Sequence, residues 1–135
     1  MIVLDASAAT AIVQPTDNAD FFRQRAGQEE AIAPTLFHAE VDNVQWKYVR
    51  AGQADFKTAA MRAFTATELV DRFFDNRELY VEAFGESVRL NHPAYDMFYF
   101  VLARRYNATL FTVDKALARL CLSEGVSCAC PGVSE

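Results

Sequence analysis

No stretch of this sequence is long and apolar enough to span a lipid bilayer, and there is no linker, repeat or low-complexity segment. The opening residues MIVLDAS carry an acid at position 5 and no basic start, so they lack the pattern of a secretory signal. A length of 135 residues is usual for one domain and is enough to bury one core. We therefore expect a single domain over residues 1–135.

Nitrogen and sulfur ligands for metals are also scarce. The three cysteines, Cys121, Cys128 and Cys130, have no zinc spacing and no nearby histidine pair, so we expect them to be reduced, buried side chains in a cytoplasmic protein. The two histidines, His38 and His92, lack ligand spacing as well, and His92 precedes a proline in a predicted turn. The sequence therefore predicts neither a zinc site nor a catalytic histidine.

Positive charge is not in excess: 13 lysines and arginines stand against 18 acidic residues, and the net charge is −5. Nucleic-acid binders usually have a basic balance, so this charge is evidence against that class. An acidic metal site, however, contributes negative charges that bound cations would offset. The basic side chains could also gather on one face, so the net charge leaves nucleic-acid binding open.

Short apolar runs alternate along the chain with segments of helical periodicity. The predicted strands are 2–4, 31–33, 109–113 and 126–129. The predicted helices are 8–13 capped by Ser7, 17–26 capped by Asp17, 36–51, 53–75 with a break near 65–67, 77–90, 93–106 and 115–123; the segment 69–74 fits a strand or a helix end. This alternation favours an α/β fold whose parallel sheet is covered by helices on both faces.

Two acids directly follow apolar strands. Ligands of parallel sheets bind at the carboxyl ends of the strands, which is where Asp5 and Asp114 fall. An acid after a buried strand loses solvation, and a bound cation would compensate. Thr112 alternates with apolar neighbours and could orient a carboxylate through its hydroxyl. The alternatives are a helix cap or salt bridge for Asp5, and an N-cap of the helix 115–123 for Asp114.

Two further acids lie on helices. Asp96 begins a helix that is apolar on nearly all sides, so we expect it to be buried and to need a partner. The helix dipole contributes only about 0.3–1 kcal/mol, which is less than the cost of burying an ion. Glu40 shares the apolar face of its helix, whereas Asp42 lies about 200° around the helix and is expected in solvent, with a contact to a metal ligand as the alternative. An arginine partner for Glu40 is the alternative.

Carboxylates without usable histidine or cysteine ligands indicate Mg²⁺ or Mn²⁺. Three or four converging acids can hold one or two such ions. Two ions about 3.5–4 Å apart would clamp the attacking and leaving oxygens of an in-line displacement. The predicted reaction is therefore phosphodiester hydrolysis.

The segments VLDASA, AEVDN and PAYDMFYFVLARRYNATLFTVDKAL resemble PIN domains, in particular the VapC-type toxins of bacterial toxin–antitoxin pairs. The resemblance implies a three-layer α/β/α fold around a parallel sheet. It also implies a Mg²⁺- or Mn²⁺-dependent endoribonuclease acting on tRNA or other structured RNA, blocked by a cognate antitoxin and usually forming a homodimer. The positions that match the four motif acids and their supporting hydroxyls are Asp5, Glu40, Asp96, Asp114, Ser7 and Thr112.

Basic and aromatic side chains provide candidates for contacts with these partners. Arg104, Arg105 and Lys115 could contact phosphate, although surface charge at a helix C-terminus explains the two arginines as well. Six aromatic residues could line a groove for an antitoxin helix or a dimer surface, with core packing as the alternative. They are Phe21, Phe22, Trp46, Tyr48, Phe73 and Phe74.

Two other functions fit parts of the pattern. An aspartyl-phosphate phosphatase also places a nucleophilic aspartate after its first strand, but it usually has a second acid two residues later, where this chain has Ser7. A PIN-like binding or regulatory module would have a degenerate site, against which the presence of all four acids counts.

Overall fold

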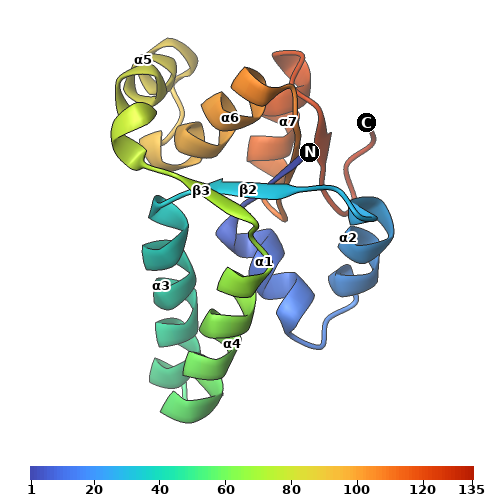
Figure 1. The fold of residues 1–135 in the computed structure, drawn as a ribbon, viewed down its shortest axis with the longest axis vertical. Helices are drawn as coiled ribbons and strands as arrows, with labels where there is room; N and C mark the ends of the chain where they lie inside the picture. The colour runs from blue at the N-terminus through green and yellow to red at the C-terminus, as the bar shows by residue number, and fades with distance from the viewer.

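The computed structural model describes residues 1–135, and a five-stranded sheet forms its middle layer (Figure 1). All neighbouring strands are parallel, in the order β3-β2-β1-β4-β5. The strands are β1 Ile2–Leu4, β2 Ala31–Pro34, β3 Arg72–Phe74, β4 Thr109–Phe111 and β5 Cys128–Ala129.

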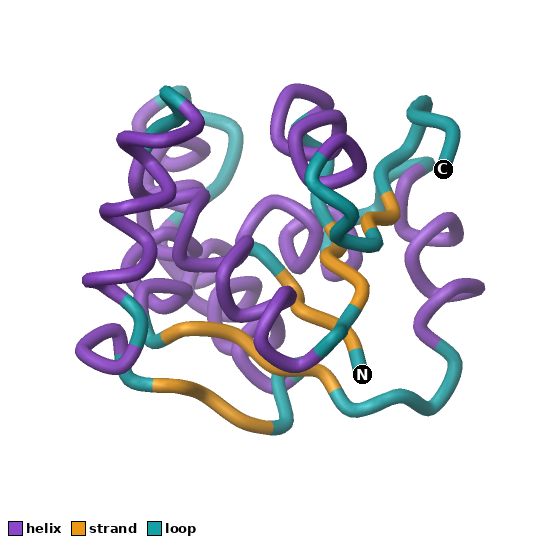
Figure 2. The backbone as a smooth tube through the Cα atoms, turned by 90° about the horizontal axis from the view of Figure 1, so that it is seen from above, coloured by secondary structure: helices purple, strands orange, loops and turns teal.

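Helices cover both faces of this sheet (Figures 1 and 2). One face carries α1 (Ala6–Val13), α2 (Asn18–Ala26), α3 (Leu36–Arg50) and α4 (Phe56–Glu68). The other carries α5 (Tyr80–Leu90), α6 (Ala94–Tyr106) and α7 (Lys115–Ser123), with a short 3₁₀ turn, η1 (Asn76–Glu78), before α5. The predicted three-layer α/β/α fold is therefore confirmed. None of the helices combines the length and apolar character needed to cross a membrane.

Alternation along the strands divides the core into two clusters. Val3 points into the cluster beneath α5, α6 and α7, whereas its neighbours Ile2 and Leu4 point into the cluster beneath α1 to α4. All three side chains are buried, as expected for a parallel strand covered on both faces. The near-continuous apolar run of α6 has the same cause, because α6 packs against β1, β2, β4 and α5 at once.

The helix starts differ from the predictions in two places. Asp5, not Ser7, caps α1: its carboxylate accepts a hydrogen bond from the Ala8 N–H, and Ser7 already lies within the first turn. Asp17 precedes α2 but makes no capping hydrogen bond, because its own backbone is helical rather than extended. The predicted cap of α7 by Asp114 is confirmed.

The predicted break near 65–67 is absent, and α4 continues to Glu68. The hydroxyls of Thr65 and Thr67 donate to the carbonyl oxygens of Met61 and Ala63, one turn earlier, which keeps both threonines within the helix. The ambiguous segment 69–74 contains a helix end followed by β3. The last two predicted strands are shorter than expected, while the left-handed Asn107 ends α6 as predicted.

The strand order positions the candidate site. The chain leaves β1 into α1 on one face of the sheet and leaves the neighbouring β4 into α7 on the other (Figure 1). Connections that diverge in this way open a crevice at the carboxyl ends of the two strands, where ligands of open α/β sheets bind. Leu4 pairs with Phe111, so Asp5 and Asp114 follow adjacent strand ends.

Candidate metal and active site

Asp5 lies at the floor of this crevice and is only 7% exposed. Its Oδ1 accepts hydrogen bonds from the Ser7 hydroxyl at 2.6 Å and from the Ala8 N–H at 2.8 Å. Burial raises the pKa of Asp5 to about 6, although these donors and the nearby Thr112 hydroxyl partly offset the effect. The ionised carboxylate is therefore costly to keep in the protein unless a cation compensates for its lost hydration.

Ser7 and Thr112 connect Asp5 to the turn between β4 and α7. The Ser7 hydroxyl lies 3.4 Å from the Thr112 hydroxyl and accepts the Val113 N–H at 3.1 Å. Thr112 is fully buried, and its hydroxyl accepts the Asp114 N–H at 3.1 Å. These bonds fix the two strand-end acids relative to each other, although Asp5 and Asp114 are separated by most of the chain.

Asp114 both caps a helix and faces the crevice. Its Oδ1 accepts the N–H groups of Ala116 at 2.9 Å and Leu117 at 3.1 Å, which satisfies the first turn of α7. The residue is exposed, unlike Asp5. The capping alternative for Asp114 is therefore correct, and it is compatible with a role in ligand binding.

Asp96 is less buried than predicted, with 28% of its side chain exposed, because the start of α6 opens toward the crevice. Its partner is His92, whose Nε2 lies 2.7 Å from Asp96 Oδ2. Burial raises the pKa of Asp96, the contact with His92 lowers it, and the charge of Asp114 raises it. His92 is not among the predicted site residues, although its four-residue spacing from Asp96 is a usable signal.

Glu40 on α3 is half-buried and lines the cleft, as the helical-face argument predicts, while Asp42 is exposed. The buried Tyr99 hydroxyl donates to Glu40 Oε1 at 2.6 Å, so the partner is a tyrosine on α6 rather than an arginine. Burial raises the pKa of Glu40, the Tyr99 hydrogen bond lowers it, and the charges of Asp5 and Asp96 raise it. The acids thus repel one another across the crevice.

A cleft of about 590 Å³ brings all four predicted acids together. They come from the ends of β1 and β4, from α3 and from the first turn of α6. The residues lining the cleft are Asp5, Ala6, Ser7, Leu36, Ala39, Glu40, Asn43, Val44, Lys47, Tyr95, Asp96, Tyr99 and Asp114. Four polar lining residues are not among the predicted site residues: Asn43, Lys47, Tyr95 and Tyr99. Asn43 and Lys47 lie one and two turns after Glu40 on the same helix face, which is a usable signal.

Protein hydrogen bonds hold one oxygen of each acid and leave the other without a direct donor. The held oxygens are Asp5 Oδ1, Glu40 Oε1, Asp96 Oδ2 and Asp114 Oδ1. Four oriented, mutually repelling carboxylates with one available oxygen each suit a hard divalent cation. No three acidic side chains converge closely enough in this structure to form the ligand set of one ion.

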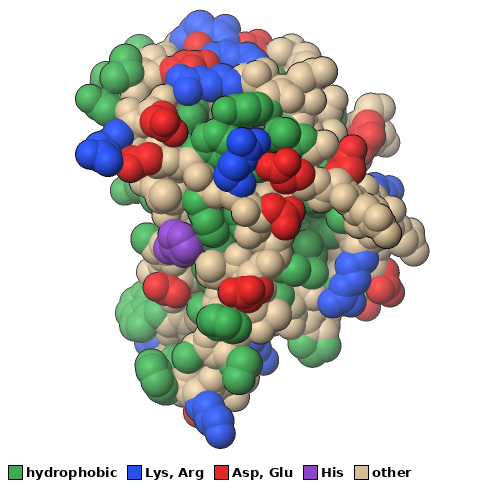
Figure 3. Space-filling model, viewed as in Figure 1, with side chains coloured by type: hydrophobic (Ala, Val, Ile, Leu, Met, Phe, Trp, Pro, Cys, Tyr) green, Lys and Arg blue, Asp and Glu red, His purple; other side chains and the backbone are tan.

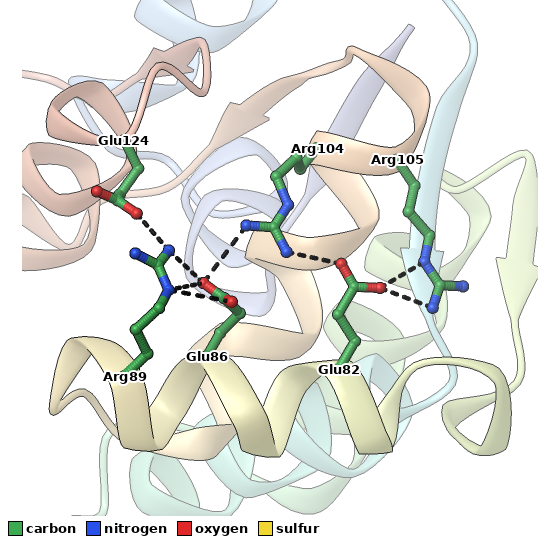
Figure 4. Close-up of polar contacts among 6 residues, drawn as sticks. All are labelled: Glu82, Glu86, Arg89, Arg104, Arg105 and Glu124. Atoms are coloured by element: carbon green, nitrogen blue, oxygen red, sulfur yellow. Dashed lines mark hydrogen bonds and ion pairs between the residues drawn. The ribbon is translucent and has the colours of Figure 1, made fainter.

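The predicted phosphate contacts lie outside the cleft. Arg104 pairs with Glu82 at 2.7 Å and Glu86 at 3.4 Å, and Arg105 pairs with Glu82 at 2.8 Å, within a network that joins α5 to α6 (Figure 4). Lys115 does not line the cleft, and its ammonium group lies beside Gly132. These pairings support the alternative of structural surface charge for the two arginines.

Surface charge does not separate into a basic face in the view of Figure 3. Acidic and basic side chains are interspersed there, with apolar patches between them. At the cleft, Lys47 is the one basic side chain among the lining residues, and it takes part in no ion pair. Among the residues that line the cleft, positive side-chain charge therefore comes from Lys47.

Comparison with known proteins agrees with the geometry. The family profile of the PIN domain matches residues 2–122, which span all four acids. The crystal structure of PAE2754 from Pyrobaculum aerophilum has a similar fold, with a TM-score of 0.71 and 23% sequence identity over 87% of this chain and 77% of that chain. No curated protein matches the sequence. The extent of the profile match shows that the chain belongs to the PIN domain family.

Proposed function

We propose that the protein is a Mg²⁺- or Mn²⁺-dependent endoribonuclease whose site consists of Asp5, Glu40, Asp96 and Asp114. PIN domains are generally nucleases that use divalent metal ions. The observation that carries the proposal for this chain is the cleft in which four acids each present one oxygen without a direct donor. Burial and mutual repulsion raise the pKa values of Asp5, Glu40 and Asp96. A bound divalent cation would lower these pKa values again.

Each acid has a distinct place in the proposed reaction. Asp5 forms the rigid floor, because two strong hydrogen bonds fix it and burial excludes water around it. Asp96 and Glu40 line the cleft as half-buried side chains, and Asp114 lines it as an exposed side chain that is open to solvent. A bound divalent ion supplies Lewis acidity toward a phosphodiester and lowers the pKa of water. The protein's own contribution is to orient the ligands and to place Lys47 where a phosphate would enter.

Cleavage of RNA by the purified protein tests this function. We expect strand cleavage in Mn²⁺ or Mg²⁺ and complete loss of cleavage in excess EDTA, because carboxylates alone cannot activate water or neutralise the phosphate. Sequencing of the cleaved ends would identify the RNA target. A protein that neither binds Mn²⁺ nor cuts any RNA would instead fit the PIN-like binding module.

Replacement of Lys47 by Ala should weaken RNA binding without changing Mn²⁺ affinity. Lys47 is exposed, unpaired and at the cleft, so it can contact one phosphate. Loss of one phosphate contact reduces the magnitude of the salt dependence of log K by about 1. Binding to a labelled RNA, measured from 50 to 200 mM salt with Asp5→Asn present to prevent cleavage, checks this. Lys57→Ala, an exposed lysine on α4, is the control, and equal salt slopes for the two variants would contradict the prediction.

The toxin role, the antitoxin and the homodimer are further parts of the proposal. Trp46 is 52% exposed beside a groove of about 350 Å³ between α3 and α4, which suits an apolar helix of an antitoxin. Phe22, by contrast, is fully buried in the core.

Val81, Phe84 and Val88 are exposed on α5 and offer an apolar surface to a second copy. Light scattering should give twice the 15.1 kDa mass of the chain, and a monomer at all concentrations would contradict the dimer.

A further inference from the structure

His92 lies in the turn between α5 and α6, and its backbone is held from both sides. Its N–H donates to the Ser87 carbonyl oxygen at 3.1 Å, and its own carbonyl oxygen accepts the Ser87 hydroxyl at 2.6 Å. Asn91 before it adopts the left-handed conformation that ends α5, and Pro93 after it fixes the entry into α6. The Cα of His92 therefore has a fixed position relative to the first turn of α6.

The imidazole of His92 is directed at the candidate site. Its side chain is only 15% exposed, and Nε2 lies 2.7 Å from Asp96 Oδ2. The histidine does not itself line the cleft, whereas Asp96 does. One ring nitrogen therefore holds Asp96 Oδ2, and the second carboxylate oxygen, Oδ1, accepts no hydrogen bond from the protein.

We propose that His92 is a positioning residue that sets the rotamer of Asp96 and so raises the affinity of the site for a divalent cation. The inference rests on the proposed metal-dependent function. Asp5 and Asp114 are each fixed by backbone N–H groups, whereas the hydrogen bond from His92 is the only one that the Asp96 carboxylate receives, as the Tyr99 bond is for Glu40. Groups that orient a metal ligand typically contribute 10–100-fold in metal affinity.

Two amide substitutions separate positioning from a general structural role. The Gln side chain places its NH₂ group close to the position of Nε2, so His92→Gln can still donate to Asp96 Oδ2. The Asn side chain is one carbon shorter and places its NH₂ group near the position of Nδ1, out of reach of Asp96. The two variants therefore differ mainly in whether the donor reaches the carboxylate, because both keep the backbone bonds to Ser87.

Mn²⁺ binding to the full-length chain, followed by electron paramagnetic resonance or calorimetry, is the measurement. We expect His92→Asn to weaken Mn²⁺ affinity about 10–100-fold and His92→Gln to stay within a few-fold of the parent. His38→Asn, which removes the other histidine from an exposed position outside the cleft, should leave the affinity unchanged. Circular dichroism melting establishes that each variant is folded. His92→Ser replaces His92→Asn if that variant unfolds.

Each outcome decides the inference. Parental Mn²⁺ affinity in folded His92→Asn overturns it, and equal losses in the Gln and Asn variants overturn it by showing a role in packing rather than positioning. If the parent itself binds no Mn²⁺, the proposed function fails and the inference fails with it. Tight binding by the parent and by both variants overturns only the inference, so the two failures are distinguishable.

Discussion

Asp5→Asn should reduce RNA cleavage in saturating Mn²⁺ by at least about 10³-fold. The Asn side chain can keep the hydrogen bonds from Ser7 and Ala8 through its remaining oxygen, so the fold around position 5 stays intact. The substitution replaces the available Oδ2 with a neutral NH₂ group, which cannot bind a cation. A metal ion contributes several kcal/mol to the transition state, and each 1.36 kcal/mol corresponds to a factor of ten in rate. Single-turnover cleavage of a labelled RNA measures the effect.

Asp42→Asn is the matched control for this result. Asp42 is an exposed acid on the same helix as Glu40, but it does not line the cleft, so its loss removes the same charge without touching the proposed site. We expect Asp42→Asn to retain the parental cleavage rate and Asp96→Asn to behave like Asp5→Asn. Cleavage by Asp5→Asn within about tenfold of the parent would show that this carboxylate is not a ligand of the reacting centre.

The parts of the site that sequence could predict are those encoded by local pattern. Asp5 and Asp114 follow apolar runs, and the ends of neighbouring parallel strands must meet at one edge of the sheet. Glu40 followed from helical periodicity together with the resemblance to PIN domains. The same local reasoning predicted the alternation of elements and hence the three-layer fold.

The parts that could not be predicted depend on contacts between distant elements. Tyr99 meets Glu40 across 59 residues, and no spacing rule connects α6 with α3. Burial of Asp96 was overestimated because the apolar composition of α6 reports the packing of its later turns, whereas its first turn opens to the cleft. Local sequence patterns indicate which side of a helix or strand is buried. Which distant element that side contacts depends on the tertiary fold.

The second large expected effect is on stability: Asp5→Asn, which should abolish cleavage, should make the metal-free protein more stable. Burial raises the pKa of Asp5 from 3.8 to about 6, so the folded state binds a proton more tightly than the unfolded state does. The favourable contribution of the protonated Asp5 to the free energy of unfolding is therefore fully present below pH 3.8. This contribution falls as the pH rises from 3.8 to about 6, and it is absent above pH 6. The shift corresponds to about 3 kcal/mol, at 1.36 kcal/mol for each unit of pKa. Asp5→Asn removes this cost because its amide does not ionise.

In EDTA at pH 7.5, Asp5→Asn should consequently be more stable than the parent by up to about 3 kcal/mol, or on the order of 10 °C in melting temperature. The difference should disappear near pH 4, where the parental carboxyl is protonated in the fold. Excess Mn²⁺ should stabilise the parent, by about 2.7 kcal/mol at 100 times Kd, and leave Asp5→Asn unchanged. Melting curves of both proteins at pH 4 and 7.5, with and without Mn²⁺, give all four comparisons. A metal-free parent as stable as Asp5→Asn at pH 7.5 would mean that the buried carboxylate is not under electrostatic strain. The central reason for assigning a cation to Asp5 would then be lost.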